Sequence, residues 1–176
     1  MNICVFCSAN DVDEAYVAAT RRLGELIAER KYTYVYGGAD KGLMKVIADV
    51  VERAGGTIVG ISFELLRSEV RQGSHELIME RDLAARKARI VERSDAFVVL
   101  PGGLGTFDEV TEVLELKKHR LHKKPIVVLN TNGFYDGLQQ QLERMHAEGF
   151  LPVPLAEMIT FVATPEAAME YIEAHV

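Results

Sequence analysis

The stretch that decides the fold is P-G-G-L-G-T-F-D-E, which runs from Pro101 to Glu109. It follows the apolar run Ala96–Leu100 and opens an amphipathic run that continues through Leu116. This order predicts a buried strand, a tight glycine turn and the N-terminus of a helix. The backbone N–H groups of a first helical turn have no partner within the helix, and the helix dipole adds partial positive charge there. We therefore expect an anion such as a phosphate to bind against Gly103–Thr106.

The rest of the chain alternates between short β-rich runs and helical stretches, which is the pattern of an α/β fold with a largely parallel sheet flanked by helices. The predicted strands cover residues 2–8, 32–36, 57–61, 76–80, 96–100 and 126–130. The other predicted helices cover residues 13–30, 43–53, 82–93 and 135–147, with a last one that begins at Thr164. We expect the segment 62–75 to be a mobile excursion near the site. A chain of 176 residues with 48% hydrophobic content suits one domain, which we expect to span residues 1–176.

A similar unit of strand, glycine loop and helix lies earlier in the chain. Here the strand 32–36 leads into Gly37–Gly42 and then into a helix over Leu43–Arg53. In parallel α/β sheets, ligands bind beyond the carboxyl ends of the strands, where the strand order reverses. We therefore expect three loops to converge at that edge, namely Ser8–Asp11, Gly37–Gly42 and Pro101–Thr106.

The formal net charge of −6 argues against nucleic acid or an anionic membrane as the main partner, because such surfaces are bound by clustered Lys and Arg. A single small anion held by backbone N–H groups remains compatible with this charge. The N-terminal segment lacks a basic lead and is too short for a secretion signal, and no stretch is expected to span a membrane.

Cys4 and Cys7 form a C-x-x-C pattern. Residues three apart on a strand point to opposite faces, so a disulfide or a shared metal ion would be awkward. We interpret the two residues as buried thiols of a cytoplasmic protein. No set of His, Cys, Asp and Glu residues has the spacing of a metal site, and we predict neither a metal nor a cofactor.

The glycine motif matches neither common phosphate-binding pattern. Asp108 stands where the dinucleotide pattern has its third glycine, and no G-K-[ST] follows as in a triphosphate-binding loop. The glycines either bind an anion or merely permit a sharp turn, and their recurrence in two loops favours the anion. The basic run over residues 117–124 is expected to complement a helix C-terminus, with His122 packed in the interior.

Glu109 and Arg86 each allow two interpretations. Thr106 to Glu109 fits a T-x-x-E capping box, in which the Glu bonds back to the N-cap N–H. Alternatively, a carboxylate one turn from a bound phosphate has a chemical role, because a purely structural one would only weaken anion binding. Arg86 forms either an ordinary i,i+4 pair with Asp82 or part of the site. The residues alone leave both alternatives open.

Several motifs, taken in order, resemble the LONELY GUY (LOG) family, long mislabelled lysine decarboxylases. The matching residues are Cys4-Val5-Phe6-Cys7, Val35-Tyr36-Gly37-Gly38, Gly42-Leu43-Met44, Arg86-Lys87-Ala88, the motif at 101–109, His122-x-Lys124-Pro125 and Gly149-Phe150. The resemblance covers roughly residues 2–165 and implies a Rossmann-like three-layer fold. It also implies hydrolysis of the N-glycosidic bond of a nucleoside 5′-monophosphate, either an N6-modified AMP such as isopentenyladenosine monophosphate or AMP itself, to free base and ribose 5-phosphate.

The resemblance implies that Arg86 and Glu109 are the catalytic pair. It implies phosphate or nucleotide contacts for Ser8, Gly38, Gly42, Met44, Lys87, Gly102, Gly103, Gly105 and Thr106. Departure of the base builds positive charge on C1′ of the sugar, which an ionised Glu109 would stabilise, and the nearby helix N-terminus is expected to favour that ionisation. The family is typically dimeric, so the resemblance implies a homodimer whose partner completes the site.

The chain departs from the family pattern at Ser8-Ala9-Asn10, Ala39, Lys45 and Ile90, which leaves the preferred base more open than the reaction. Two other functions compete with hydrolysis. One is binding of a purine mononucleotide without turnover, against which Glu109 argues. The other is a pyridoxal-phosphate decarboxylase, which needs a Schiff-base Lys with a pyridinium partner, and no Lys is singled out in that way.

Overall fold

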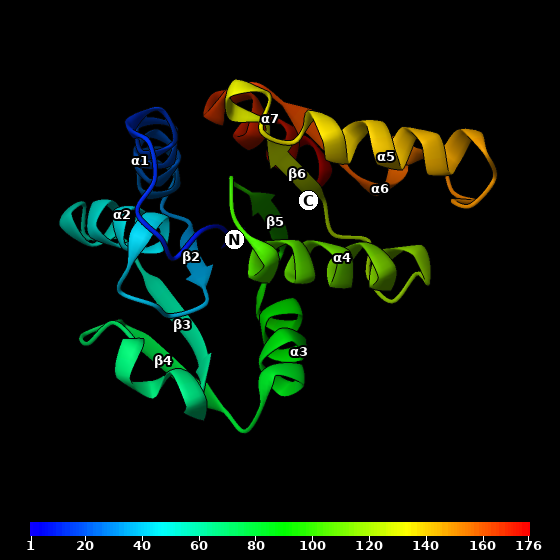
Figure 1. Cartoon of the computed structure of the whole chain (residues 1–176). Helices are drawn as coiled ribbons and strands as arrows, with labels where there is room; N and C mark the ends of the chain where they lie inside the picture. The colour runs from blue at the N-terminus through cyan, green and yellow to red at the C-terminus, as the bar shows by residue number, and fades with distance from the viewer.

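Seven parallel strands form a single sheet in the computed structural model, which describes residues 1–176 (Figure 1). The strands are β1 (Asn2–Phe6), β2 (Thr33–Tyr36), β3 (Ile58–Phe63), β4 (Glu76–Glu80), β5 (Ala96–Val99), β6 (Ile126–Leu129) and β7 (Thr160–Val162). Their order across the sheet is β4-β3-β2-β1-β5-β6-β7. From β1 the chain adds β2, β3 and β4 in turn on one side of the sheet. It then crosses to the other side of β1, where it adds β5, β6 and β7. The predicted parallel sheet is confirmed, and the order reverses between β1 and β5.

Helices cover both faces of the sheet and give three layers (Figure 1). They are α1 (Glu14–Glu29), α2 (Gly42–Arg53), α3 (Leu83–Arg93), α4 (Leu104–Lys118), α5 (Asp136–Ala147), α6 (Leu155–Met158) and α7 (Pro165–His175), with short 3₁₀ turns η1 (Glu64–Glu69) and η2 (Thr131–Gly133). One core lies between the sheet and α1, α2 and α7, and the other lies between the sheet and α3, α4 and α6. None of these helices combines the length and apolar character required to cross a membrane.

The alternation of side chains along β1 separates the two cores. Ile3 and Val5 point into the core under α1 and α2, whereas Cys4 and Phe6 point into the core under α3 and α4. Cys7 belongs to the first core, so the two cysteines lie on opposite faces, as their spacing predicts. Both are buried free thiols.

The helix ends follow their predicted chemistry at several points. The carboxylate of Asp13 accepts a hydrogen bond from the N–H of Ala15 at 2.9 Å and caps α1. Thr164 caps α7 through the N–H of Ala167 at 3.2 Å, and Pro165 is its first residue. Side-chain oxygens at these positions satisfy N–H groups that the helix itself leaves unpaired.

Two elements and two strand ends differ from the sequence prediction, and one of these ends is that of β1, which stops at Phe6 instead of residue 8. The edge strand β7 and the helix α6 were not predicted, because three and four residues are too few for a periodic pattern. β3 continues to Phe63, paired with Glu80, instead of ending at residue 61. The excursion that follows contains η1 and an antiparallel bridge between Ala39 and Val70, so it is tied to the glycine loop before α2.

We expect Gly42→Ala to destabilise the protein more than Gly55→Ala. Both glycines have left-handed φ angles, +51° and +74°, which cost an L-residue about 1–2 kcal/mol. A Cβ at position 42 would also come within 2.5 Å of backbone atoms of Ala9 and Asn10, whereas a Cβ at position 55 would meet nothing within 4 Å. Urea unfolding of the two variants measures the difference, and equal losses of stability would contradict this account of the loop contact.

Candidate active site

A buried ion pair joins α3 to α4 beside the point where the strand order reverses. The Nη2 atom of Arg86 lies 3.0 Å from Oε1 of Glu109, and the two side chains are only 8% and 9% exposed. The Nε–H of Arg86 also donates to the backbone oxygen of Ile61 in β3 at 2.9 Å. The guanidinium therefore links the β3 side of the sheet to the helix that follows β5.

This arrangement corrects the i,i+4 interpretation of Arg86. Asp82 uses its carboxylate to cap α3, accepting the N–H of Ala85 at 2.8 Å, and it pairs with Arg81 at 3.2 Å. Arg86 instead points into the interior toward Glu109. The pair with Asp82 is thus excluded, and Arg86 lies beside Glu109, the other residue of the predicted catalytic pair.

The capping-box interpretation of Thr106 and Glu109 is also wrong. Helix α4 begins at Leu104 with Gly103 as its N-cap, and no side chain bonds to the N-cap position. Thr106 thus lies inside the first turn, buried against Gly102, where a Cβ would overlap the Thr106 side chain. Glu109 falls one turn further along, where its carboxylate faces Arg86. The glycine turn is compact enough for the helix to begin earlier than the motif indicates.

The environment of Glu109 raises the pKa of its carboxyl group. Burial is the largest cause, and the charge of Arg86 and its hydrogen bond oppose it only in part. The expectation that the helix N-terminus favours ionisation does not account for this direction, because the dipole acts mainly within the first turn and Glu109 lies beyond it. The site therefore holds a carboxyl group that ionises less readily than an exposed Glu.

Two helix N-termini with no side-chain cap flank the end of β1. Neither α2 nor α4 has a side-chain hydrogen bond at its N-cap. Helices α5 and α6 also lack one, whereas α1, α3 and α7 are capped by Asp13, Asp82 and Thr164. Unlike α5 and α6, both α2 and α4 follow glycine-rich turns that leave strands paired with β1. Uncapped N–H groups at a helix start are suited to an anionic ligand.

The three predicted loops converge through the backbone of Ser8. Its N–H donates to the oxygen of Pro101 at 3.3 Å, and its oxygen accepts the N–H of Leu43 at 3.0 Å. Its hydroxyl accepts the N–H of Asn10 at 3.0 Å. Ser8 therefore holds the start of α2 and the turn before α4 against the end of β1.

The other predicted contact residues differ in how accessible they are. Gly103 and Gly105 are exposed at the start of α4, and Gly42 and Met44 are half-buried at the start of α2. Gly38 is buried and its oxygen accepts the N–H of Arg71 at 2.8 Å, so it faces the protein interior. Its φ of +81° explains the glycine without a ligand.

Lys87, next to Arg86, joins α3 to α4 on the solvent side. Its Nζ lies 3.1 Å from Asp108 and 3.1 Å from Glu112, and its side chain is 16% exposed. A small apolar pocket lies between this pair of helices, with Glu109 in its wall together with Phe6, Ile90 and Val113. These contacts give Lys87 a structural role between the helices in addition to the predicted one at the nucleotide.

Gly37 is a site residue that the sequence interpretation did not single out. A Cβ at this position would overlap the Nη2 atom of Arg86, the nitrogen that binds Glu109. The signal in the sequence was the Gly37-Gly38 pair directly after a buried strand, which indicates close approach of another group.

The basic run lies at the far end of α4. The prediction that His122 packs in the interior is confirmed, because its Nε2 lies 2.9 Å from the oxygen of Val113 and the residue is buried. A surface cavity of about 630 Å³ opens there, but neither Arg86 nor Glu109 lines it. Its size therefore does not mark it as the site of the chemistry that the Arg86–Glu109 pair supports.

Known proteins match this chain in both sequence and fold. The family model described as "possible lysine decarboxylase" matches residues 44–172. A cytokinin riboside 5′-monophosphate phosphoribohydrolase from Rhodococcoides fascians is 39% identical over 154 residues, which are 85% of this chain and 78% of that protein. A probable enzyme of the same name from Oryza sativa subsp. japonica is 38% identical over 168 residues, 94% of this chain and 73% of that protein.

Solved structures with the same fold include molybdenum-cofactor proteins. The molybdenum cofactor binding protein of Rippkaea orientalis has a TM-score of 0.74 and 22% identity, with 98% of this chain and 95% of that chain covered. The molybdenum cofactor carrier protein of Chlamydomonas reinhardtii has a TM-score of 0.75 and 24% identity, with 98% of each chain covered. At these identities the likeness shows a shared fold alone.

The fold and the sequence matches together define a Rossmann-type hydrolase. The chain belongs to the LONELY GUY family of phosphoribohydrolases, the family whose model still has the description of a lysine decarboxylase.

We expect Arg86→Met to raise the pKa of Glu109 further. Burial favours the neutral carboxyl group, and Arg86 supplies the main opposing effect, so its removal leaves burial unopposed. Carboxyl ¹³C NMR titrations of the wild type and the variant, with the signal assigned through Glu109→Gln, measure the shift. Arg93→Met is the matched control. Arg93 lies in α3 like Arg86 but pairs with Glu76, so its removal should leave the pKa of Glu109 unchanged. An unchanged pKa in Arg86→Met would contradict the coupling.

Proposed function

We propose that this protein hydrolyses the N-glycosidic bond of a nucleoside 5′-monophosphate and releases the free base and ribose 5-phosphate. The observation that carries the proposal is the position of the buried Arg86–Glu109 pair beside two uncapped helix N-termini. A carboxylate and two helix N-termini without side-chain caps thus share one edge of the sheet. The names of the relatives from Rhodococcoides fascians and Oryza sativa support the same reaction.

The proposed chemistry uses the carboxylate of Glu109 at the sugar. As the C1′–N bond breaks, its electron pair leaves with the base and positive charge develops on C1′. An ionised Glu109 stabilises that charge or orients the attacking water, whose oxygen bonds to C1′ and whose proton ends on the base. Arg86 fixes the carboxylate in place and limits the rise of its pKa. The buried setting strengthens this electrostatic effect because the local dielectric constant is low.

The phosphate is proposed to bind at the N-terminus of α4. Gly103 and Gly105 have no side chains and are exposed, so a phosphate can approach their backbone N–H groups. The N-terminus of α2, at Gly42 and Met44, lies across Ser8 and is available to another part of the nucleotide. Of the predicted contact residues, Gly38 has a structural explanation and Lys87 already pairs with two carboxylates.

The proposed substrate is AMP with a modified N6 position, such as isopentenyladenosine monophosphate, or AMP itself. A panel of nucleoside 5′-monophosphates that includes both, with the free base measured by chromatography, tests the proposal. Release of base from at least one of them is expected. If the wild type binds AMP but releases no base from any nucleotide of the panel, the hydrolase proposal fails. The buried free thiols Cys4 and Cys7 are in keeping with the proposed cytoplasmic setting.

We further propose that the protein is a homodimer that buries the exposed apolar side chains of α4 and the loop after it. Leu104 is 88% exposed, Phe107 46% and Leu121 71%, and exposed side chains of this size are typical of a protein interface. Multi-angle light scattering should report twice the mass of the 19.6 kDa chain. A monomer at micromolar concentration would contradict this proposal.

We expect Glu109→Gln to reduce base release by about 10²–10⁴-fold, the usual contribution of a positioned acid–base group, with AMP affinity close to that of the wild type. The amide keeps the shape of the carboxylate but lacks its charge. Base release and calorimetric AMP binding are measured side by side. Glu115→Gln is the control, because Glu115 is an exposed residue of the same helix that pairs with Lys118. Comparable rates in Glu109→Gln and Glu115→Gln would exclude Glu109 from catalysis.

A further inference from the structure

The excursion after β3 folds back over the glycine loop that precedes α2. The N–H of Asp40 donates to the oxygen of Glu69 at 2.9 Å, and the N–H of Arg71 donates to the oxygen of Gly38 at 2.8 Å. Between these two contacts, Ala39 and Val70 form an antiparallel bridge. The loop Gly37–Gly42 is therefore held on one side by Ser8 and on the other by residues 69–71.

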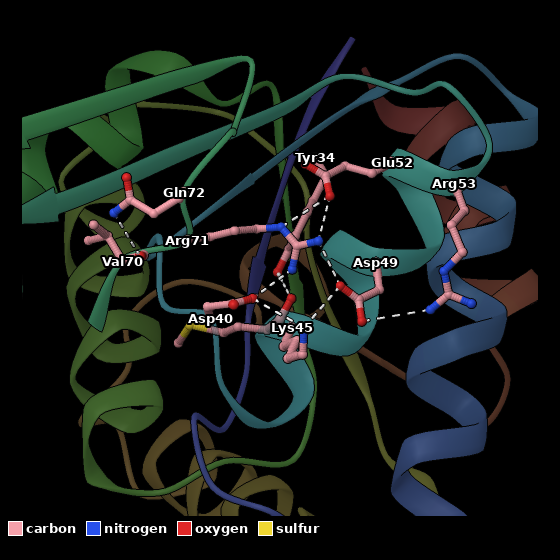
Figure 2. Close-up of polar contacts among 10 residues, drawn as sticks. Tyr34, Asp40, Lys45, Asp49, Glu52, Arg53, Val70, Arg71 and Gln72 are labelled. Atoms are coloured by element: carbon pink, nitrogen blue, oxygen red, sulfur yellow. Dashed lines mark hydrogen bonds and ion pairs between the residues drawn. The ribbon is translucent and has the colours of Figure 1, made fainter. Parts of the chain in front are cut away.

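The side chain of Arg71 also joins the excursion to the loop and to α2 through ion pairs. Its guanidinium reaches Asp40 in the loop at 2.6 Å and Asp49 in α2 at 2.6 Å, and it also binds Glu52 in α2 (Figure 2). The Arg71 side chain is 11% exposed. Figure 2 shows the guanidinium between these carboxylates, with Lys45 on the far side of Asp40 and Asp49.

These contacts leave Arg71 little capacity to bind a ligand itself. Nη1 donates to Asp40, while both Nε and Nη2 donate to Glu52. A guanidinium has five N–H donors in a fixed planar arrangement, which suits it to join several carboxylates at once. Arg71 therefore acts through the position of Asp40 and of the loop that contains it.

The position of this loop bears directly on the proposed site. Gly37 lies against the guanidinium of Arg86, and Gly42 packs on the backbone of Ala9 and Asn10. The N–H of Leu43 donates to Ser8. A shift of the loop would thus move the uncapped start of α2 and the residues that follow β1 together.

Charge balance gives the direction of the effect of removing Arg71. The cluster contains three carboxylates, those of Asp40, Asp49 and Glu52, and three cations, Arg71, Lys45 and Arg53, a net charge of zero. Without Arg71 the net charge is −1. Lys45 contacts Asp40 and Asp49 only at 3.5 and 3.3 Å, and Arg53 contacts Asp49 only at 3.7 Å. Asp40 is the one carboxylate on the loop, so mutual repulsion would displace the loop and place more negative charge beside the N-terminus of α2.

We propose that Arg71 is a positioning residue for nucleotide binding, which holds the Gly37–Gly42 loop in its binding conformation through Asp40. This inference rests on the proposed function. No residue of the Arg71 cluster contacts the Arg86–Glu109 pair directly, so the effect falls mainly on substrate binding and much less on the chemical step. A role in fold stability alone would lower the melting temperature without a change in affinity.

The test is the AMP affinity and the steady-state kinetics of Arg71→Ala. Kd for AMP by calorimetry, and KM for a nucleotide that the wild type hydrolyses, should each rise about tenfold, the equivalent of about 1.4 kcal/mol, while kcat stays within about twofold of the wild type. Arg67→Ala is the matched control, because Arg67 lies in the same excursion and pairs only with Glu64, so its Kd should equal that of the wild type. Arg71→Lys, which keeps the charge but not the planar set of donors, should be intermediate.

Asp40→Ala distinguishes an effect of loop position on AMP affinity from an effect of net charge. It also tests the proposal if Arg71→Ala does not fold. Asp40 is an exposed loop residue, so this variant should fold. Loss of the link to Arg71 should raise Kd for AMP, although the variant has one negative charge fewer. A wild-type or lower Kd in Asp40→Ala, or a wild-type Kd in Arg71→Ala with a lower melting temperature, would overturn the proposal. A wild type that binds a nucleotide of the panel but releases no base from any of them would defeat the hydrolase proposal only, and a wild type that binds no nucleotide of the panel would defeat both.

Discussion

The ion pair between Arg86 and Glu109 is the contact on which the site depends, because it joins the helix before β5 to the helix after it. Removal of two charges from water costs several kcal/mol per ion, and mutual attraction recovers that cost only when geometry and further hydrogen bonds are good. Here Arg86 gains one further acceptor, the oxygen of Ile61, and the pKa of Glu109 still rises. Two apolar side chains would fill the same space at less cost. Stability alone therefore does not account for the pair, which is consistent with its proposed role at the substrate.

The two helices that begin at this edge of the sheet also lack a stabilising side-chain contact at their N-termini. A side-chain cap contributes about 1 kcal/mol to a helix, and α1, α3 and α7 each have one. Helices α2 and α4 begin with glycine-rich turns and lack such caps at the two positions that flank the end of β1, and α5 and α6 lack them elsewhere. The N–H groups at the start of α4, and those of α2 apart from Leu43, whose N–H donates to Ser8, suit this edge to an anion, even though the protein as a whole has a net charge of −6. Local backbone geometry, and not the overall charge, is therefore the basis for the proposed phosphate site.

Much of the sheet and the location of the site could be predicted from the sequence, since strands buried on both faces are continuous apolar runs and the switch-point rule places three loops together. The start of α4 could not, because both Gly103 and Thr106 are acceptable N-caps and only the tertiary contacts of Thr106 distinguish them. The partner of Arg86 lies on another helix, and no local pattern encodes a contact of that kind. The ion pairs of Arg71 could not be predicted for a similar reason. The excursion has no periodic sequence pattern, and the carboxylates that fix Arg71 lie on another element, α2.

The contact between Gly37 and Arg86 has a consequence for how this sequence can vary. The space that a methyl group would need at position 37 is already filled by the guanidinium nitrogen that binds Glu109. The three positions therefore cannot change independently in descendants of this chain. Alanine at position 37 requires the guanidinium of Arg86 to shift, and with it the contact to Glu109. Substitution at this glycine is thus a sequence marker of a relative in which the Arg86–Glu109 contact has been rearranged.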